Sequence, residues 1–200
     1  MRRFRNSDLT EMVRVLLNHG CIAVPTDTVF GLCAAVNDES REKLYEIKDR
    51  PKTKAFPVMC ADIGQLREIA ETDDRAETLI GALMPGPLTV VLRKHPECTC
   101  IHGETVAVRM ADGVLKELLD ALGGPIYLTS ANHSGMPECR TPEEIERQCP
   151  GIDGILEGTP GYGKASTILD LTQKEIRILR EGPVGMEEIS RTVKGERRAL

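Results

Sequence analysis

The sequence contains no tryptophan, and aromatic residues make up only 3% of its 200 residues. Its core must therefore be built from aliphatic side chains, since few rings are available to fill it. The sequence also lacks any apolar run near the roughly 20 residues that a membrane-spanning helix needs. The basic start at residues 1–6 is not followed by an apolar stretch, which argues against a secretory signal peptide. These absences predict a chain that does not insert into membranes.

An excess of positive charge is also absent. Lys and Arg number 26 against 31 Asp and Glu, which gives a formal net charge of −5. Such a chain is not built as a whole to coat nucleic acid, although this does not exclude a local basic cleft. The seven cysteines, an odd number without the spacing of a disulfide framework, indicate a reducing compartment. We therefore expect a cytoplasmic protein whose cysteines are mostly small core residues.

Strand and helix signals alternate along the chain, without internal repeats or long flexible linkers. Amphipathic segments predict helices at 7–17, 40–48, 62–70, 74–84 and 114–122, with two more beginning near 141 and 185. Short apolar and β-branched segments predict strands at 21–25, 56–60, 88–92, 105–110, 126–129, 166–171 and 176–180. This alternation predicts an α/β fold with a large mixed sheet flanked by helices.

Several helix ends carry recognisable signals. Ser40 is the expected cap of the second helix, and Gly20 is placed to end the first. Asp62 and Gln65 have the spacing of a capping box. The strongest signal is Thr141-Pro-Glu-Glu144, which puts proline at the first helical position and glutamate at the third.

Residues 158–165 nearly match the phosphate loop G-x-x-x-x-G-K-[ST]. The match fails at Ala165, where the motif needs a hydroxyl group to hold Mg²⁺. The residues that follow are β-branched and predict a strand, whereas a phosphate loop opens a helix whose amides face the phosphate. We therefore interpret this segment as a glycine-rich loop between strands, and we do not assign Lys164 to phosphate binding.

Two histidines and two cysteines cluster at His95, Cys98, Cys100 and His102. Their types suit tetrahedral zinc, but the single residue between the cysteines is shorter than the usual two-residue spacer. The segment also falls in an expected surface loop between two strands. The sequence therefore favours an exposed loop over a metal site, and we assign no metal ligands.

Three segments place polar groups where expected strands or helices end. Residues 25–32 follow a buried strand, where α/β sheets usually bind ligands, although Thr and Asp also satisfy turns. Residues 48–54 hold four cations. These cations could bind an anionic ligand, or they could interact with the helix dipole at a solvated C-terminal helix end. Residues 129–135 combine hydroxyls, an amide and glycine directly after a strand, a composition that suits an anion or a nucleotide.

Taken in order, these segments resemble the threonylcarbamoyl-adenylate synthase family, also called YrdC-like. The matching stretches are 25–32, Lys48-x-Arg50-Pro51, 84–89, 106–110, 129–135, 166–170 and 179–182, within about residues 7–185. The Lys-x-Arg and Ser-x-Asn pair is the hallmark of that family. The resemblance implies one domain over 1–200, with a core at about 7–185 and a C-terminal tail at 186–200. It also implies that the extra C-terminal domain of longer members is missing.

The family resemblance implies a twisted α/β sheet with a concave basic cleft that holds ATP and L-threonine. The implied reaction joins threonine, bicarbonate and ATP into threonylcarbamoyl-AMP and releases pyrophosphate, with Mg²⁺ accompanying ATP. A separate transferase would then modify the adenosine beside the anticodon in tRNA, and direct tRNA contact is a further expectation. The implied ATP-binding residues are Lys48, Arg50, Lys54, Thr105, Ser130, Asn132 and Arg180, and the implied threonine-binding residues are Thr28, Arg109 and Ser166.

Lys48 and Arg50 are the expected catalytic residues. The carbamate of threonine is already an anionic nucleophile, so catalysis would consist mainly of positioning and of neutralising phosphate charge. If Pro51 forces an extended exit from the helix, both side chains can project to one side and straddle a phosphate. Arg109 is expected to grip the threonine carboxylate with both arms of its guanidinium.

The sequence departs from the family pattern in three places. Phe30 stands where a tyrosine is common, Ala55 replaces a frequent proline, and Met59 stands where some members have a histidine near threonine. Two other functions are weighed beside the synthase. One is a non-catalytic RNA-binding module, which the net charge and the few aromatics disfavour. The other is a carbamoyl-adenylate domain of hydrogenase maturation, whose additional modules have no counterpart in this sequence.

Overall fold

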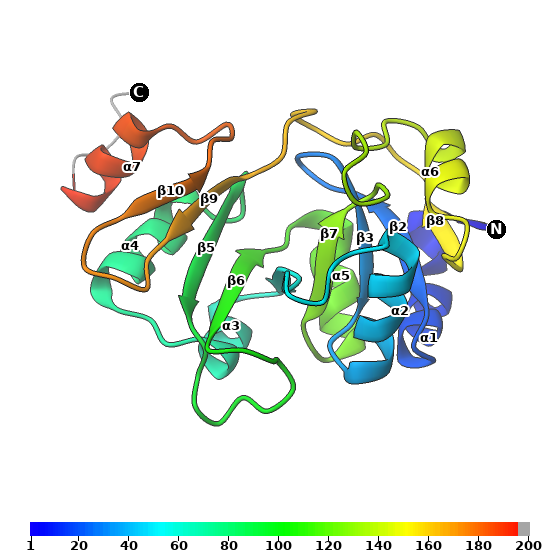
Figure 1. Cartoon of the computed structure of the whole chain (residues 1–200), viewed down its shortest axis with the longest axis horizontal. Coiled ribbons are helices and arrows are strands. Elements are labelled where there is room, and N and C mark those ends of the chain that lie inside the picture. The colour runs from blue at the N-terminus through cyan, green and yellow to red at the C-terminus, as the bar shows by residue number, and fades with distance from the viewer. Residues whose placement is uncertain (196–200) are drawn as a thin grey trace.

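The central feature of the computed structural model, which describes residues 1–195, is one twisted sheet that runs through the whole molecule (Figure 1). Its strands are β1 (Arg2–Phe4), β2 (Cys21–Pro25), β3 (Phe30–Ala35), β4 (Val58–Cys60), β5 (Leu88–Arg93), β6 (Thr105–Met110), β7 (Ile126–Ser130), β8 (Gly154–Leu156), β9 (Thr167–Asp170) and β10 (Arg177–Arg180). Their spatial order is β1-β8-β2-β3-β7-β4-β6-β5-β9-β10. The sheet is mixed, since β4 pairs with β6 in parallel and with β7 in antiparallel fashion. The predicted α/β fold with a large mixed sheet is confirmed.

The helices are short and lie on both faces of this sheet. They are the 3₁₀ helix η1 (Asn6–Asp8), α1 (Leu9–Leu17), α2 (Asp38–Lys48), α3 (Ile63–Ile69), α4 (Asp74–Leu83), α5 (Gly113–Leu122), α6 (Pro142–Gln148) and α7 (Met186–Val193). Helix α7 occupies most of the segment expected as a tail, and its Ile189 is buried in the main core. Residues 196–200 of that expected tail lie outside the described residues.

Two apolar cores lie on opposite faces of the sheet. Along β2, Cys21 and Ala23 join the core that includes α2, α3, α4 and α6, whereas Ile22 and Val24 join the core under α1 and α5. This division follows from the alternation of side chains along a strand. Every residue of Cys21–Val24 is fully buried, so the strand reads as a continuous apolar run rather than an alternating one.

Three strands were not predicted, and each lacks a clear local signal. β1 is charged in two of its three residues, and β8 has only three residues. β3 is buried along five of its six residues and contains Gly31, so neither alternation nor β-branched enrichment marks it. β8 pairs in parallel with β2, and β1 pairs in parallel with β8, so both strands form at the edge of the sheet through these pairings. Tertiary pairing therefore decides these strands.

Two of the expected caps are confirmed, whereas at the end of α1 the left-handed conformation falls on His19 rather than on Gly20. The Asp62 side chain accepts from the Gln65 amide, and the Thr141 hydroxyl accepts from the Glu144 amide. The prediction for Ser40 is wrong, because Asn37 caps α2 by accepting from the Ser40 amide, which starts the helix two residues earlier.

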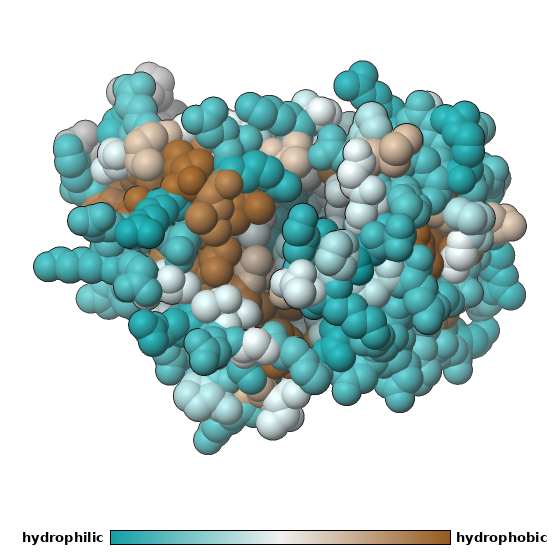
Figure 2. All heavy atoms as spheres, in the orientation of Figure 1, coloured by the Kyte–Doolittle hydropathy of each residue, from teal (hydrophilic) through white to brown (hydrophobic). Residues whose placement is uncertain are grey.

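Most of the surface seen in Figure 2 is hydrophilic, but hydrophobic side chains gather over β9 and β10. Among the large apolar side chains of this region, Leu179 on β10 is 57% exposed and Met186 on α7 is 45% exposed. On the face shown in Figure 2, the apolar patch therefore lies on the half of the sheet far from β1. Within residues 1–195, no helix has the length and apolar character needed to cross a membrane.

The Thr141 cap generates a stability prediction. Thr141→Ala removes the side-chain acceptor for a helix amide and should lower the free energy of unfolding by about 1 kcal/mol. Thr78→Ala is the matched control, because Thr78 is exposed within α4, where alanine is the better helix former. Urea denaturation measures both variants. Equal stabilities for Thr141→Ala and the parent chain would show that the cap contributes nothing.

Candidate active site

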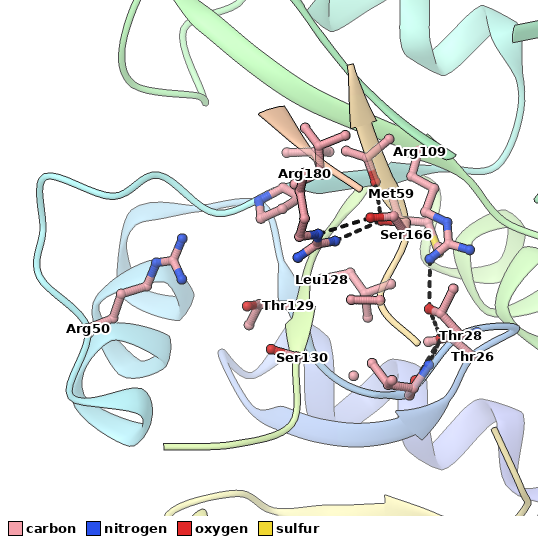
Figure 3. A pocket seen from close by; sticks show the side chains of 17 residues that line it. Thr26, Thr28, Arg50, Met59, Arg109, Leu128, Thr129, Ser130, Ser166 and Arg180 are labelled. Carbon is pink, nitrogen blue, oxygen red and sulfur yellow. Dashed lines mark hydrogen bonds between the residues drawn. The ribbon is translucent and has the colours of Figure 1, made fainter. Parts of the chain in front are cut away.

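A cavity of about 180 Å³ lies over the middle of the sheet. Its lining comes from a contiguous run of strands in the spatial order, from β3 through β7, β4, β6, β5 and β9 to β10, and from the segments that lead into them (Figure 3). The lining residues are Thr26, Thr28, Val29, Gly31, Arg50, Pro57, Val58, Met59, Thr89, Arg109, Leu128, Thr129, Ser130, Ala165, Ser166, Ile168 and Arg180. Three arginines and six Ser or Thr residues therefore reach one small space.

Arg109 is the most deeply placed of these cations, at 7% exposed. Its Nε and Nη2 donate to the Gly86 carbonyl at 3.0 and 2.9 Å, its Nη1 donates to Thr28 Oγ1 at 3.1 Å, and its Nη2 forms a salt bridge with Asp27. Burial raises the pKa of Asp27, and the positive charge of Arg109 opposes that rise. The two-armed grip expected for a threonine carboxylate is therefore already taken by Asp27 and Gly86.

Ser166 anchors the opposite wall of the cavity. Its Oγ lies 2.8 Å from Thr89 Oγ1 and accepts from Arg180 Nη2 at 3.0 Å, while its carbonyl accepts from Arg180 Nε at 3.0 Å. On the wall formed by the β2–β3 connection, Thr26 Oγ1 lies 2.9 Å from Thr28 Oγ1. Figure 3 shows the Thr28 and Ser166 side chains and the Arg180 guanidinium around the same space. Thr28 and Ser166, predicted from sequence for threonine binding, are thus brought together at one cavity.

Lys48 does not adopt the expected geometry. It is the last residue of α2 and only 1% exposed, and its ammonium donates to the Ser130 carbonyl, the Asn132 carbonyl and Asn132 Oδ1 at 2.5, 2.8 and 3.0 Å. Burial lowers its pKa to about 8. The expectation that Lys48 and Arg50 project together from an extended exit is wrong, because Lys48 is still helical and Asp49 adopts a left-handed conformation. Lys48 instead fixes the turn after β7.

Arg50 does line the cavity, and its own segment holds it there. Its Nε and Nη2 donate to the carbonyls of Lys54 and Ala55, both at 2.9 Å, and its guanidinium carbon lies 5.0 Å from the centre of the Phe56 ring. Neither Arg50 nor Arg180 forms a salt bridge with any residue in the described part of the chain. These two arginines therefore bring positive charge to the cavity without a direct salt bridge, and Glu138 is the carboxylate whose charge acts on Arg180 from nearby.

The other residues assigned to ATP are not all at the cavity. Ser130 lines it, but Asn132 is turned inward, where it accepts from Ser130 Oγ and donates to the Met136 carbonyl. Thr105 is exposed at the far end of β6, four residues from Arg109, so the sheet does not bring it to the site. The carbonyl of Lys54 holds Arg50, but the Lys54 side chain is not among the lining groups. Of the residues predicted for ATP, the cavity lining therefore includes Arg50, Ser130 and Arg180, and the assignment of the others to the nucleotide stays a prediction.

The glycine-rich segment at 158–165 packs against the β2–β3 connection. The amides of Gly161, Tyr162 and Gly163 donate to the carbonyls of Thr26, Asp27 and Thr28 at 2.7–2.9 Å. A phosphate loop needs free amides, and these three are used within the protein. The strand β9 follows, as the sequence predicted. This segment braces the wall that carries Thr26 and Thr28.

Sequence reasoning missed some groups at this site. It gave Asp27 no specific role within the segment 25–32, although this residue is the ionic partner of Arg109. It gave no role to Thr26, Thr89 or Thr129, although all three line the cavity. A usable signal existed, because Thr26, Asp27 and Thr89 all fall in stretches that carry the family resemblance. Met59, noted as a departure near threonine, does line the cavity.

Comparisons with known proteins agree on the family. The sequence model of the Sua5/YciO/YrdC family, described as telomere recombination, matches residues 14–182. The chain is 36% identical over 186 residues to a threonylcarbamoyl-AMP synthase of Vibrio vulnificus, covering 88% of this chain and 99% of the relative. It is 34% identical over 194 residues to a threonylcarbamoyl-AMP synthase of Bacillus subtilis, covering 92% of this chain and 56% of that one. The chain thus spans little more than half the length of some curated relatives.

Solved structures support the same relationship. P. abyssi Sua5 in complex with L-threonine matches with a TM-score of 0.88 at 31% identity, over 98% of this chain and 61% of that chain. E. coli YciO matches with a TM-score of 0.83 at 26% identity, over 94% and 98% of the two chains. A full-length HypF matches at 22% identity and shares the fold. The chain belongs to the Sua5/YciO/YrdC family.

Proposed function

We propose that this protein is a nucleotidyltransferase that forms threonylcarbamoyl-AMP and pyrophosphate from L-threonine, bicarbonate and ATP. The cavity carries this assignment, because buried hydroxyls and two unpaired arginines face one space in a chain whose relatives are named for that activity. The threonylcarbamoyl group would then pass to tRNA through a separate transferase. The cytoplasm is the proposed location, since all seven cysteines are free thiols.

The size of the cavity favours the amino acid as its occupant. At about 180 Å³, it is smaller than the roughly 300–1,000 Å³ of sites that enclose larger ligands. Thr28 and Ser166 are 3% and 5% exposed, and both offer hydroxyls to a polar ligand. Arg109 would contribute its remaining Nη1 proton rather than a two-armed grip. Threonine would therefore be held mainly by hydroxyl hydrogen bonds.

ATP would lie outside this inner cavity, at the more exposed arginines. Arg180 is exposed and Arg50 is half-buried, whereas Arg109 and Ser166 are buried, so the first two stand nearer to solvent. Guanidinium groups suit phosphate oxygens because their planar donors match phosphate geometry. The Ser130 hydroxyl lines the same space and would contact the nucleotide. ATP bound in this way would have its α-phosphorus between threonine and the solvent side.

The chemistry requires little beyond this positioning. The threonine amine adds bicarbonate with loss of water, and a carbamate oxygen then attacks the α-phosphorus while its bond to pyrophosphate breaks. Negative charge grows on the phosphoryl oxygens and on the leaving pyrophosphate, and fixed cations facing those atoms lower the barrier. Arg50 and Arg180 are the groups available for this role. No side chain has to remove a proton from the carbamate, because it is already anionic.

Mg²⁺ is assigned to the nucleotide rather than to a resident protein site. No carboxylate lines the cavity among the described residues, and the nearby carboxylate of Asp27 is held by Arg109. Mg²⁺ commonly keeps several waters and binds substrate phosphates. The ion would thus arrive with ATP and neutralise part of its charge, with hydroxyl oxygens as the only protein ligands available from the lining residues.

Arg50 provides the first test of this function. Arg50→Ala should reduce threonine-dependent pyrophosphate release by about 10²–10³, the usual cost of losing one donor to developing charge. Arg50→Lys should recover little, since a point charge does not replace the planar donors. Lys52→Ala is the matched control, because Lys52 lies in the same segment, is exposed and pairs only with Glu42. Near-parental turnover by Arg50→Ala, with the melting temperature preserved, would refute the assignment.

Lys48 generates a pH-dependent prediction. Its pKa is about 8 in the folded protein and about 10.4 in an unfolded chain, so the unfolded state binds more protons between these values. Its burial penalty is therefore relieved as the pH rises through that window, which by itself increases stability. Loss of the charge and of one of three N–H donors weakens its hold on the Ser130 and Asn132 carbonyls as the pH rises through about 8.

We therefore compare the kcat/KM of the parent chain with that of Lys48→Met. The parent value divided by the variant value should fall as the pH rises through about 8. Comparing the two chains removes the common contribution of the threonine amine, which also titrates in alkaline solution. Pyrophosphate release at fixed ionic strength between neutral and alkaline pH measures this ratio. A ratio that stays constant across the range would show that the Lys48 charge does not position the site.

Amino-acid specificity tests the inner cavity separately. Serine should be used less well than threonine, because it loses one methyl contact worth about 1–3 kcal/mol. Valine has the shape of threonine but no hydroxyl, so it would leave groups such as Thr28 or Ser166 unpaired and should be rejected more strongly than serine. Competition assays with the three amino acids give the order. Equal turnover of threonine and valine would indicate that the cavity recognises shape alone.

A further inference from the structure

The loop between β5 and β6 carries the cluster of two histidines and two cysteines. Within it, the Sγ atoms of Cys98 and Cys100 lie 3.6 Å apart. The histidines do not join them, because His102 Nε2 pairs with Asp38 at 2.9 Å and His95 Nδ1 faces the Glu97 amide. No group of three or more His, Cys, Asp or Glu side chains is arranged for a metal ion anywhere in residues 1–195. The loop therefore presents a pair of thiols.

This pair differs from the other cysteines of the chain. Cys100 is exposed, whereas the remaining six cysteines are buried. Burial raises the pKa of Cys33 and of Cys60 to about 12, which keeps those thiols protonated and inert. Cys100 is therefore the thiol that a dissolved reagent reaches, and Cys98 is the only partner whose sulfur lies beside it.

We propose that Cys98 and Cys100 are a redox-active dithiol that closes reversibly to a disulfide by exchange with small disulfides such as oxidised glutathione. The Cys100 thiolate attacks one sulfur of the reagent and expels one glutathione thiolate, which leaves a mixed disulfide. The Cys98 thiolate then attacks Cys100 Sγ and expels the second glutathione thiolate. Two cysteine thiols are thereby oxidised, and one glutathione disulfide is reduced to two thiols.

The local contacts favour closure by movement of Cys100. A disulfide needs its sulfurs about 2.05 Å apart, so the present separation must shorten. Cys98 is fixed, because its amide donates to the His95 carbonyl and its carbonyl accepts from Lys94 Nζ at 2.7 Å. Burial and the neighbouring Cys98 raise the pKa of Cys100, and the positive charge of Lys94 opposes part of that rise, so mildly alkaline solution favours the thiolate. A bond across one intervening residue closes a small ring, and strained disulfides of this kind are readily reduced again.

Closure would act on structure beyond the loop itself. The Cys100 carbonyl accepts from the Tyr127 hydroxyl at 3.4 Å. Ile101 and His102 line a second cavity of about 310 Å³ together with Tyr127 and Phe56. Moving Cys100 toward Cys98 would therefore shift one wall of that second cavity. This effect does not depend on the proposed synthase activity.

The test uses the intact protein, reduced and then incubated with oxidised glutathione at mildly alkaline pH. Remaining thiols are alkylated after denaturation, and the products are read by intact mass and peptide mapping. The oxidised parent chain should carry two alkyl groups fewer than the reduced chain, which corresponds to a loss of two hydrogens, and should show Cys98 and Cys100 linked. Treatment with dithiothreitol before alkylation should restore the mass of the reduced, alkylated chain. Cys98→Ser should stop at one glutathione adduct on Cys100, while Cys100→Ser should remain unmodified. Circular dichroism checks that both variants are folded.

Other outcomes would overturn the proposal. A parent chain that accumulates the glutathione adduct on Cys100 without closing would show that Cys98 does not act as the resolving thiol. A loss of two hydrogens that persists in Cys98→Ser would assign the disulfide to a different pair. Absence of any modification in the parent chain would show that Cys100 does not react in the folded protein.

Discussion

The buried guanidinium of Arg109 joins three parts of the chain that the sheet brings together near its centre. From β6 it bonds the Gly86 carbonyl before β5 and pairs with Asp27 and Thr28 in the β2–β3 connection. A buried cation requires such partners, because leaving it unpaired costs several kcal/mol. The amides of the glycine-rich segment at 161–163 then close over the same connection. The inner wall of the cavity therefore depends on this one neutralised charge.

A second buried cation plays a similar part on the other side of the site. The Lys48 ammonium ties the end of α2 to the turn after β7, through acceptors 82 and 84 residues away in the sequence. The Ser130 hydroxyl, which lines the cavity, is bonded to the same Asn132 oxygen that Lys48 holds. Two of the four hallmark residues, Lys48 and Asn132, thus hold the backbone around the cavity in place. The other two, Arg50 and Ser130, line the cavity itself.

The positive charge of the site is divided between two environments. Arg109 is compensated by Asp27 and is buried, whereas Arg50 and Arg180 are bound only by backbone carbonyls and by the neutral hydroxyl of Ser166. Carbonyl acceptors orient a guanidinium without cancelling its charge, so these two arginines stay available to an anion. The cavity therefore holds one buried arginine with a carboxylate partner and two more exposed arginines without a salt bridge.

The sequence by itself determined the features that depend on near neighbours: the Thr141 and Asp62 caps, the alternating strands and helices, the Ala165 break in the apparent phosphate loop, and the ordered motifs of the family. The tertiary structure alone decided which polar groups meet. Lys48 is buried because the end of α2 packs on the turn after β7, and strand order pairs Asp27 with Arg109. Thr105 is separated from the cavity because it lies at the other end of β6. Helix caps and periodicity act over a few residues, whereas these contacts join groups about 80 residues apart, which local patterns do not encode.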